Sequence, residues 1–74
     1  MGKPTRITNS IRALRFARGE MTQAELAQRI GVTRQTVIAI EQGRYSPSLE
    51  VAFQIARVLR VPLDEVFQYP EGDA

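Results

Sequence analysis

The chain has 74 residues and a formal net charge of +2, which predicts one small domain with a thin core. It contains neither cysteine nor histidine, which excludes disulfides, thiolate metal sites and the commonest general base of enzymes. No apolar run approaches the roughly 20 residues of a membrane span, and the N-terminal residues lack the apolar segment of a secretory signal. We therefore expect a soluble, cytoplasmic, all-helical domain that needs no cofactor or metal.

The charge is distributed unevenly along the chain. Residues 1–44 hold eight cationic side chains against three acidic ones, whereas residues 45–74 hold two against five. Nine of the ten cations are arginine, the residue suited to bidentate contact with phosphates and guanine edges. The basic half favours a polyanion as partner, and the alternative is a solvated surface of mixed charge.

The N-terminal part predicts an arm and a first helix. Residues 1–6 are polar and contain Pro4, so we expect a flexible arm over residues 1–7 in which Lys3 and Arg6 are available to a partner, with a disordered basic end as the alternative. The first helix is predicted to start near Thr8 or Asn9, to end by Gly19, and to turn two apolar side chains to the core, Ile11 and Leu14.

Capping residues then mark two more helices. Thr22 and Glu25 have the spacing of a capping box, which starts a second helix that runs to about Ile30. Gly31 can supply a left-handed turn. Thr33 is placed to cap a third helix, predicted to run through Gln42 and to end at Gly43.

Two further helices are predicted in the C-terminal part. Ser48 is expected to cap a fourth helix with an apolar face, and Pro62 to begin a short fifth helix. The apolar face of the fourth helix is predicted to be Leu49, Ala52, Ile55, Ala56 and Leu59. We expect no strand, a domain over residues 8–69 and a flexible acidic tail over 70–74. The loop aromatic Tyr45 is expected to cover the core.

The second and third helices together predict a helix-turn-helix unit at about residues 22–42. A glycine turn joins two short helices whose apolar residues fit a steep crossing, with small Ala27 at the closest approach. The inward positions are Leu26, Ala27, Ile30, Val32, Val37 and Ile40. The alternative is a helical hairpin in any small bundle.

Residues 11–67 resemble the Xre family of regulators, whose fold is that of the lambda-type repressor and Cro DNA-binding domains. The resemblance rests on "TQAELA", "IGVTRQTV", "IEQGRYSPSL" and "VPLDEVF". It implies a compact five-helix, lambda-repressor-like domain, sequence-specific binding of double-stranded DNA and a homodimer on a two-fold operator. The link "RGEMTQ", near Gly19–Met21, is one residue longer than is usual in the family.

When a helix-turn-helix domain of this kind binds DNA, the start of its second helix enters the major groove. Arginine can pair bidentately with guanine, glutamine with adenine, and an apolar side chain can touch a thymine methyl. The predicted base-reading residues are therefore Arg34, Gln35, Ile38 and Ala39. The alternative for this stripe is an exposed surface that touches nothing.

A second group of residues is predicted to contact the DNA backbone. Gln23 begins the first motif helix, and Arg44 follows the recognition helix in a loop. The hydroxyl donors are Thr22, Thr33 and Thr36. Arg12 and Arg18 are expected to be part of a solvated face.

The resemblance also implies a structural ion pair between Arg15 and Glu41, which would hold the recognition helix against the first helix. A dimer is predicted to use apolar residues near the C-terminus, namely Phe67, Tyr69, Leu63 and Val66, with core closure as the alternative for Leu63 and Val66.

The prediction is a DNA-binding transcriptional regulator, a repressor found in the cytoplasm and on the bacterial nucleoid. The alternative is an antitoxin that binds a partner toxin and regulates its own operon. An enzyme is not expected, because the chain lacks histidine, cysteine, a glycine-rich phosphate loop and clustered carboxylates.

Overall fold

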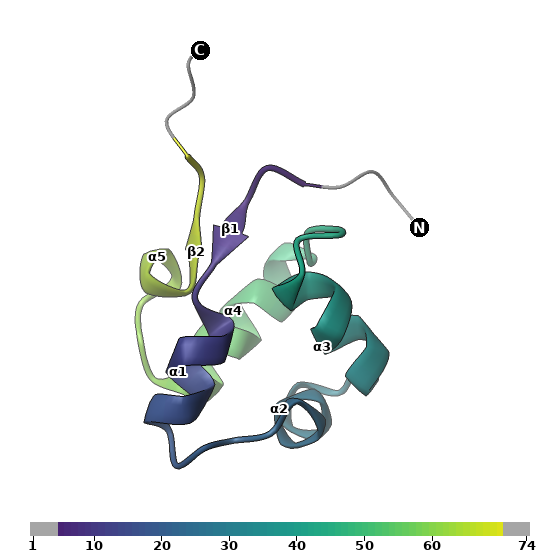
Figure 1. The fold of residues 1–74 in the computed structure, drawn as a ribbon, viewed down its shortest axis with the longest axis vertical. Helices are drawn as coiled ribbons and strands as arrows, with labels where there is room; N and C mark the ends of the chain where they lie inside the picture. Colours follow the sequence, from purple (N-terminus) through teal and green to yellow (C-terminus); the bar gives the residue numbers. More distant parts are fainter. Residues whose placement is uncertain (1–4, 71–74) are drawn as a thin grey trace.

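The structure is a computed structural model that describes residues 5–70. The prediction for Lys3 lies outside the described residues, as do residues 71–74 of the predicted acidic tail. The elements are β1 (Thr8–Asn9), α1 (Ile11–Ala17), α2 (Gln23–Ile30), α3 (Arg34–Glu41), α4 (Leu49–Leu59), α5 (Leu63–Val66) and β2 (Phe67–Gln68). The five predicted helices are confirmed. Figure 1 shows α1, α2 and α3 arranged around α4, with β1 and β2 side by side at the other end of α1 from α2.

The predicted helix starts are confirmed by their caps. The Oγ1 of Thr22 accepts a hydrogen bond from the N–H of Glu25 at 3.0 Å, and the Glu25 carboxylate accepts one from the N–H of Thr22 at 2.8 Å. Thr33 accepts from the N–H of Thr36, and Ser48 accepts from the N–H of Val51. Because each cap gives a partner to an amide that the helix itself cannot satisfy, the three starts are fixed locally.

The turn between α2 and α3 is made by Gly31. Its φ is +75° and its ψ is +30°, the left-handed conformation, and its N–H closes the helix onto the carbonyl of Ala27. A Cβ at this position would meet no atom within 4 Å, so only the backbone conformation requires glycine here.

The prediction that no strand is present is wrong. Thr8 and Asn9, expected at the start of the first helix, form β1, which pairs antiparallel with β2 in the register Thr8–Gln68 and Asn9–Phe67. The N–H of Ser10 also donates to the carbonyl of Val66 at 2.9 Å. Backbone groups from the two ends of the domain thus satisfy one another, and α1 begins only at Ile11.

The arm was predicted to extend to residue 7, but its last residues lie against the domain. The N–H of Thr5 donates to the carbonyl of Gly43 at 3.3 Å, and its Oγ1 accepts from the N–H of Ile7 at 3.1 Å. The described chain therefore joins the body of the domain before residue 8.

One core lies between the helices. Its buried apolar side chains include the predicted inward residues of α2 and α3, and Tyr45 packs half-buried against it. The prediction for Leu49 is wrong: it is the first residue of α4 and is 68% exposed. The core residues are Ile11, Met21, Leu26, Ala27, Ile30, Val37, Ile40, Ile55, Ala56, Leu59 and Val66. None of the described helices is long and apolar enough to cross a membrane.

Candidate nucleic-acid interface

The start of α3 presents two exposed polar side chains. Arg34 and Gln35 are the first two residues of the helix, and both are exposed. The caps of Thr33 fix the direction of this first turn, and the Oγ1 atoms of Thr33 and Thr36 lie 3.0 Å apart. Arg34 and Gln35 therefore project from a helical turn whose backbone is fixed by Thr33 before them and Thr36 after them.

Further along α3, the predicted exposed stripe needs a correction. Ala39 is only 4% exposed, and Ile38 is half-buried. Because a helix turns about 100° per residue, burying Ala39 together with Val37 and Ile40 makes the buried arc of α3 about 160° wide. Ala39 therefore cannot reach a base, and the readable stripe narrows to Arg34, Gln35 and Ile38.

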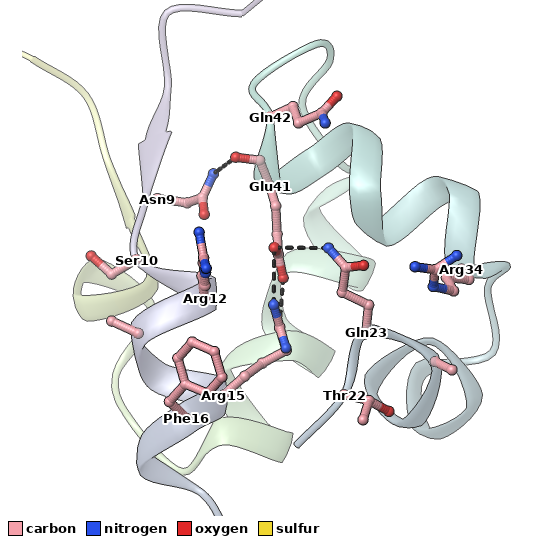
Figure 2. Close-up of a pocket in the computed structure, with 12 residues that line it drawn as sticks. Asn9, Ser10, Arg12, Arg15, Phe16, Thr22, Gln23, Arg34, Glu41 and Gln42 are labelled. Carbon is pink, nitrogen blue, oxygen red and sulfur yellow. Dashed lines mark hydrogen bonds and ion pairs between the residues drawn. The ribbon is translucent and has the colours of Figure 1, made fainter. Parts of the chain in front are cut away.

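An open groove of about 1060 Å³ runs between the starts of α1 and α2 and the side of α3. Figure 2 shows Arg12 and Arg34 at opposite sides of this groove, with Glu41 between them. Three arginines line it against one glutamate. The groove residues are Asn9, Ser10, Arg12, Ala13, Arg15, Phe16, Thr22, Gln23, Ala24, Arg34, Glu41 and Gln42.

An ion pair lies at the floor of the groove. The Nε of Arg15 on α1 donates to the Oε2 of Glu41, the last residue of α3, at 2.7 Å, and its Nη2 reaches the other carboxylate oxygen at 3.2 Å. The two side chains are 7% and 9% exposed. Arg15 also donates to the carbonyl of Met21 at 2.7 Å, in the link from α1 to α2. Arg15 is therefore engaged inside the domain rather than free to bind an anion.

Gln23, predicted as a backbone contact, has a second role. Its Nε2 donates to the Oε1 of Glu41 at 3.1 Å, so its side chain joins the ion-pair network (Figure 2). The backbone N–H groups at the start of α2 have no partner inside the helix, and Gln23 and Ala24 both line the groove. Such a helix start can bind a phosphate through its amides.

The other predicted backbone contacts are accessible to different degrees. Thr22 and Arg44 are exposed, while Thr36 is half-buried beside exposed Thr33. The N–H of Arg44 donates to the carbonyl of Ala39 at 2.9 Å, which fixes the loop directly after α3. Arg44 thus projects from the opposite end of α3 to Arg34.

Phe16 and Asn9 are groove residues for which the sequence predicts no functional role. Phe16 is 53% exposed, although it was given no role, and the guanidinium carbons of Arg12 and Arg15 lie 5.7 Å from the centre of its ring. The sequence predicts Asn9 only as a helix start. Its contacts with α3 involve residues distant in sequence, so no local sequence pattern predicts them.

The predicted dimer surface also needs a correction. Val66 is 0% exposed and belongs to the core, so it cannot contact a second chain. Leu63 and Phe67 are half-buried against that core, whereas Tyr69 is 66% exposed. The apolar surface available near β2 is therefore mostly the ring of Tyr69.

Comparison with known proteins agrees with this geometry. The family model described as helix-turn-helix matches residues 11–66, the range that contains all five helices. This chain belongs to the Xre-like helix-turn-helix family.

Its Xre-like relatives carry regulator names. The chain is 56% identical over 55 residues to an uncharacterized HTH-type transcriptional regulator of Methanothermobacter thermautotrophicus, covering 73% of this chain and 80% of the relative. It is 39% identical over 59 residues to the cryptic phage CTXphi transcriptional repressor RstR of Vibrio cholerae, covering 80% of this chain but only 52% of that protein.

A solved structure has the same fold. The restriction-modification controller protein C.AhdI of Aeromonas hydrophila matches with a TM-score of 0.67 and 33% identity, over 74% of this chain and 82% of the other. The predicted family and fold are confirmed, and the family is one of transcriptional regulators rather than enzymes.

Proposed function

We propose that this Xre-like protein binds double-stranded DNA sequence-specifically, with α3 in the major groove, and acts as a repressor. The observation that supports the proposal is that α3 has an exposed polar start and a fixed end. Its first turn presents exposed Arg34 and Gln35, while its last residue is fixed by a buried ion pair. A rigid helix with a guanidinium and an amide at its free end matches the hydrogen-bonding edges of guanine and adenine.

The charges around α3 support contact with the phosphates on both sides of the groove. The N-terminal amides of α2 and the hydroxyl of Thr22 would contact one strand, and Arg44 the other. Thr33, which caps α3, and Thr36 in its first turn add hydroxyl donors between them. Ile38, half-buried one turn after Arg34, would contact a thymine methyl.

Repression is supported by the relative from Vibrio cholerae, which is named a transcriptional repressor. We place the protein in the cytoplasm, on the DNA it regulates. The comparisons do not support the antitoxin alternative. Of the three proteins described above, one is named a transcriptional regulator, one a transcriptional repressor and one a controller protein.

The operator is proposed to be two-fold symmetric and bound by a homodimer. One short recognition helix with two or three base contacts gives little discrimination against the many competing sites of a genome, and a two-fold dimer doubles the contacts. Its half-sites would lie roughly 10–10.5 base pairs apart, so that both helices meet one face of the duplex. Tyr69, with Phe67 and Leu63 beside it, is the proposed contact between the two chains.

Selection of bound sequences from a pool of random duplex DNA tests the proposal. The expected result is an enriched sequence with two inverted half-sites at this spacing, bound with an affinity that falls steeply as salt rises. Recovery of no enriched sequence would refute specific DNA binding. Enrichment of a single, non-palindromic site would refute only the dimer.

A further inference from the structure

Asn9 connects three parts of the fold through one side chain. Its Nδ2 donates to the carbonyls of Ile40 and Glu41, at 3.1 and 3.3 Å, and its Oδ1 accepts from the N–H of Ile11 at 3.1 Å. It therefore bridges β1, the start of α1 and the end of α3. Figure 2 shows its contact with the carbonyl of Glu41. The partners identify the amide orientation, since carbonyls need a donor and an N–H needs an acceptor.

The contact with α3 involves backbone groups that the helix leaves without a partner. The last carbonyls of a helix have no intrahelical donor. The carbonyl of Ile40 accepts from the N–H of Gly43 at 3.0 Å as well as from Asn9. Asn9 therefore holds the end of α3 by its main chain, while Arg15 and Gln23 hold it by the side chain of Glu41.

Asn9 is itself held firmly. Its backbone belongs to β1 and lies opposite Phe67 in β2. The N–H of Ser10, the next residue, donates to the carbonyl of Val66 at 2.9 Å. The backbone that carries the Asn9 side chain is therefore fixed by β2 and by the carbonyl of Val66.

We propose that Asn9 is a positioning residue for DNA reading, which sets the angle of α3 and so the place of Arg34 and Gln35 in the groove. This inference rests on the proposed function. Asn9 acts through α3 and does not itself touch a base. It holds one end of the helix, and the base-reading side chains are at the other.

A small tilt of α3 at the end held by Asn9 would displace Arg34 at the other end. The rise from Arg34 to Glu41 along α3 is about 10 Å at 1.5 Å per residue, so a tilt of about 10° at the clamped end moves Arg34 by about 2 Å. The heavy-atom distance of an N–H···O hydrogen bond varies by only about 0.5 Å. A tilt of this size would therefore break a bidentate contact with a base.

Asn9→Ser isolates this contact. Serine keeps a short side-chain oxygen for the N–H of Ile11, as in the turns that serine commonly makes, but has no amide to reach α3. The control is Ser48→Ala, which removes one capping hydrogen bond at the start of α4. Both full-length variants are measured at least about 20 °C below the lower of their melting temperatures, so that only folded protein is compared.

The readout is the ratio of affinities for the selected duplex and for a scrambled duplex of the same length. In Asn9→Ser we expect the ratio to fall at least about fivefold, the low end of what one bidentate base contact contributes, with binding to scrambled DNA unchanged. In Ser48→Ala we expect the ratio of the wild type. In the free protein, the carbonyl ¹³C resonances of Ile40 and Glu41 should shift in Asn9→Ser and not in Ser48→Ala.

Any of four results would overturn the inference. An unchanged ratio in Asn9→Ser, or an equal fall in both variants, would make Asn9 a stabilising residue without a part in reading. Unshifted carbonyl resonances would show that the contact with α3 does not form. A wild type that selects no sequence would refute the proposed function and this role with it, while the resonances would still report whether Asn9 holds α3.

Discussion

The guanidinium of Arg15 and the carboxylate of Glu41 lie 2.7 Å apart with side chains 7% and 9% exposed, and they join α1 to the end of α3. Gln23 and the carbonyl of Met21 occupy further hydrogen-bonding positions of the two charged groups. Each of these buried charges has a desolvation cost that the other charge compensates. Removing one partner leaves the other buried without compensation.

Glu41→Gln should therefore lower the free energy of unfolding by about 3 kcal/mol, although it keeps the shape of the side chain. Urea denaturation followed by circular dichroism measures this change. Glu20→Gln is the control, because Glu20 is exposed and outside the helices, and it should stay within about 0.5 kcal/mol of wild type. Equal stabilities for the two variants would show that the pair contributes no more than a surface charge.

Arg34→Ala should reduce affinity for the selected duplex by about 10- to 100-fold and affinity for scrambled DNA far less, because a base contact discriminates whereas a phosphate contact does not. Fluorescence anisotropy with both duplexes gives the two values. Arg57→Ala, an exposed arginine of α4, controls for the lost charge. An equal loss on both duplexes would assign Arg34 to the phosphates.

Arg44→Ala should weaken binding to every duplex alike. If the guanidinium neutralises one phosphate, the slope of log affinity against log salt should fall by about one unit. Titrations at four or more salt concentrations, with Arg57→Ala measured in parallel, provide the slopes. A slope equal to that of wild type would remove Arg44 from the interface.

Gly31→Ala should destabilise the domain by about 1 kcal/mol, because the turn has a φ of +75° and a Cβ there would meet nothing within 4 Å. The cost is thus one of backbone conformation alone. Gly31→Asn should cost less, since asparagine tolerates the left-handed region. Thermal melts that rank asparagine below alanine would contradict this explanation.

Arg60→Gly should stabilise the domain relative to Arg60→Ala by about 1 kcal/mol. Arg60 ends α4 with a φ of +62°, a left-handed conformation that glycine adopts without strain. Because both substitutions remove the same charge, chemical denaturation of the pair isolates the backbone effect. Equal midpoints would show that Arg60 is not strained in the wild type.

The features that local sequence could predict are those made by neighbouring residues. Thr22 with Glu25, Gly31 and Ser48 act within three or four residues, and all are where the sequence placed them. The β1–β2 pair was missed because two residues are too short to show an alternation and their partners come from the far end of the chain.

The errors at the candidate site have a similar cause. Helical periodicity placed Ala39 on the readable stripe because it assumes one buried face of ordinary width, but α3 is enclosed over a wider arc. Leu49 matches the inward period of α4, yet it is the first residue of the helix and extends past the core. The residue-level assignment of DNA contacts stays a prediction.

The pairing of β1 with β2 has a consequence for how the domain assembles during synthesis. The hydrogen bond from the Oγ1 of Thr8 to the carbonyl of Gln68 spans 60 positions of sequence, whereas the caps and turns of α2, α3 and α4 need only residues already beside them. Contacts so distant in sequence are slow to form, because a long loop must close first. The caps and turns of α2, α3 and α4 therefore need only nearby residues, but the β1–β2 pair can form only after Gln68 has been synthesised.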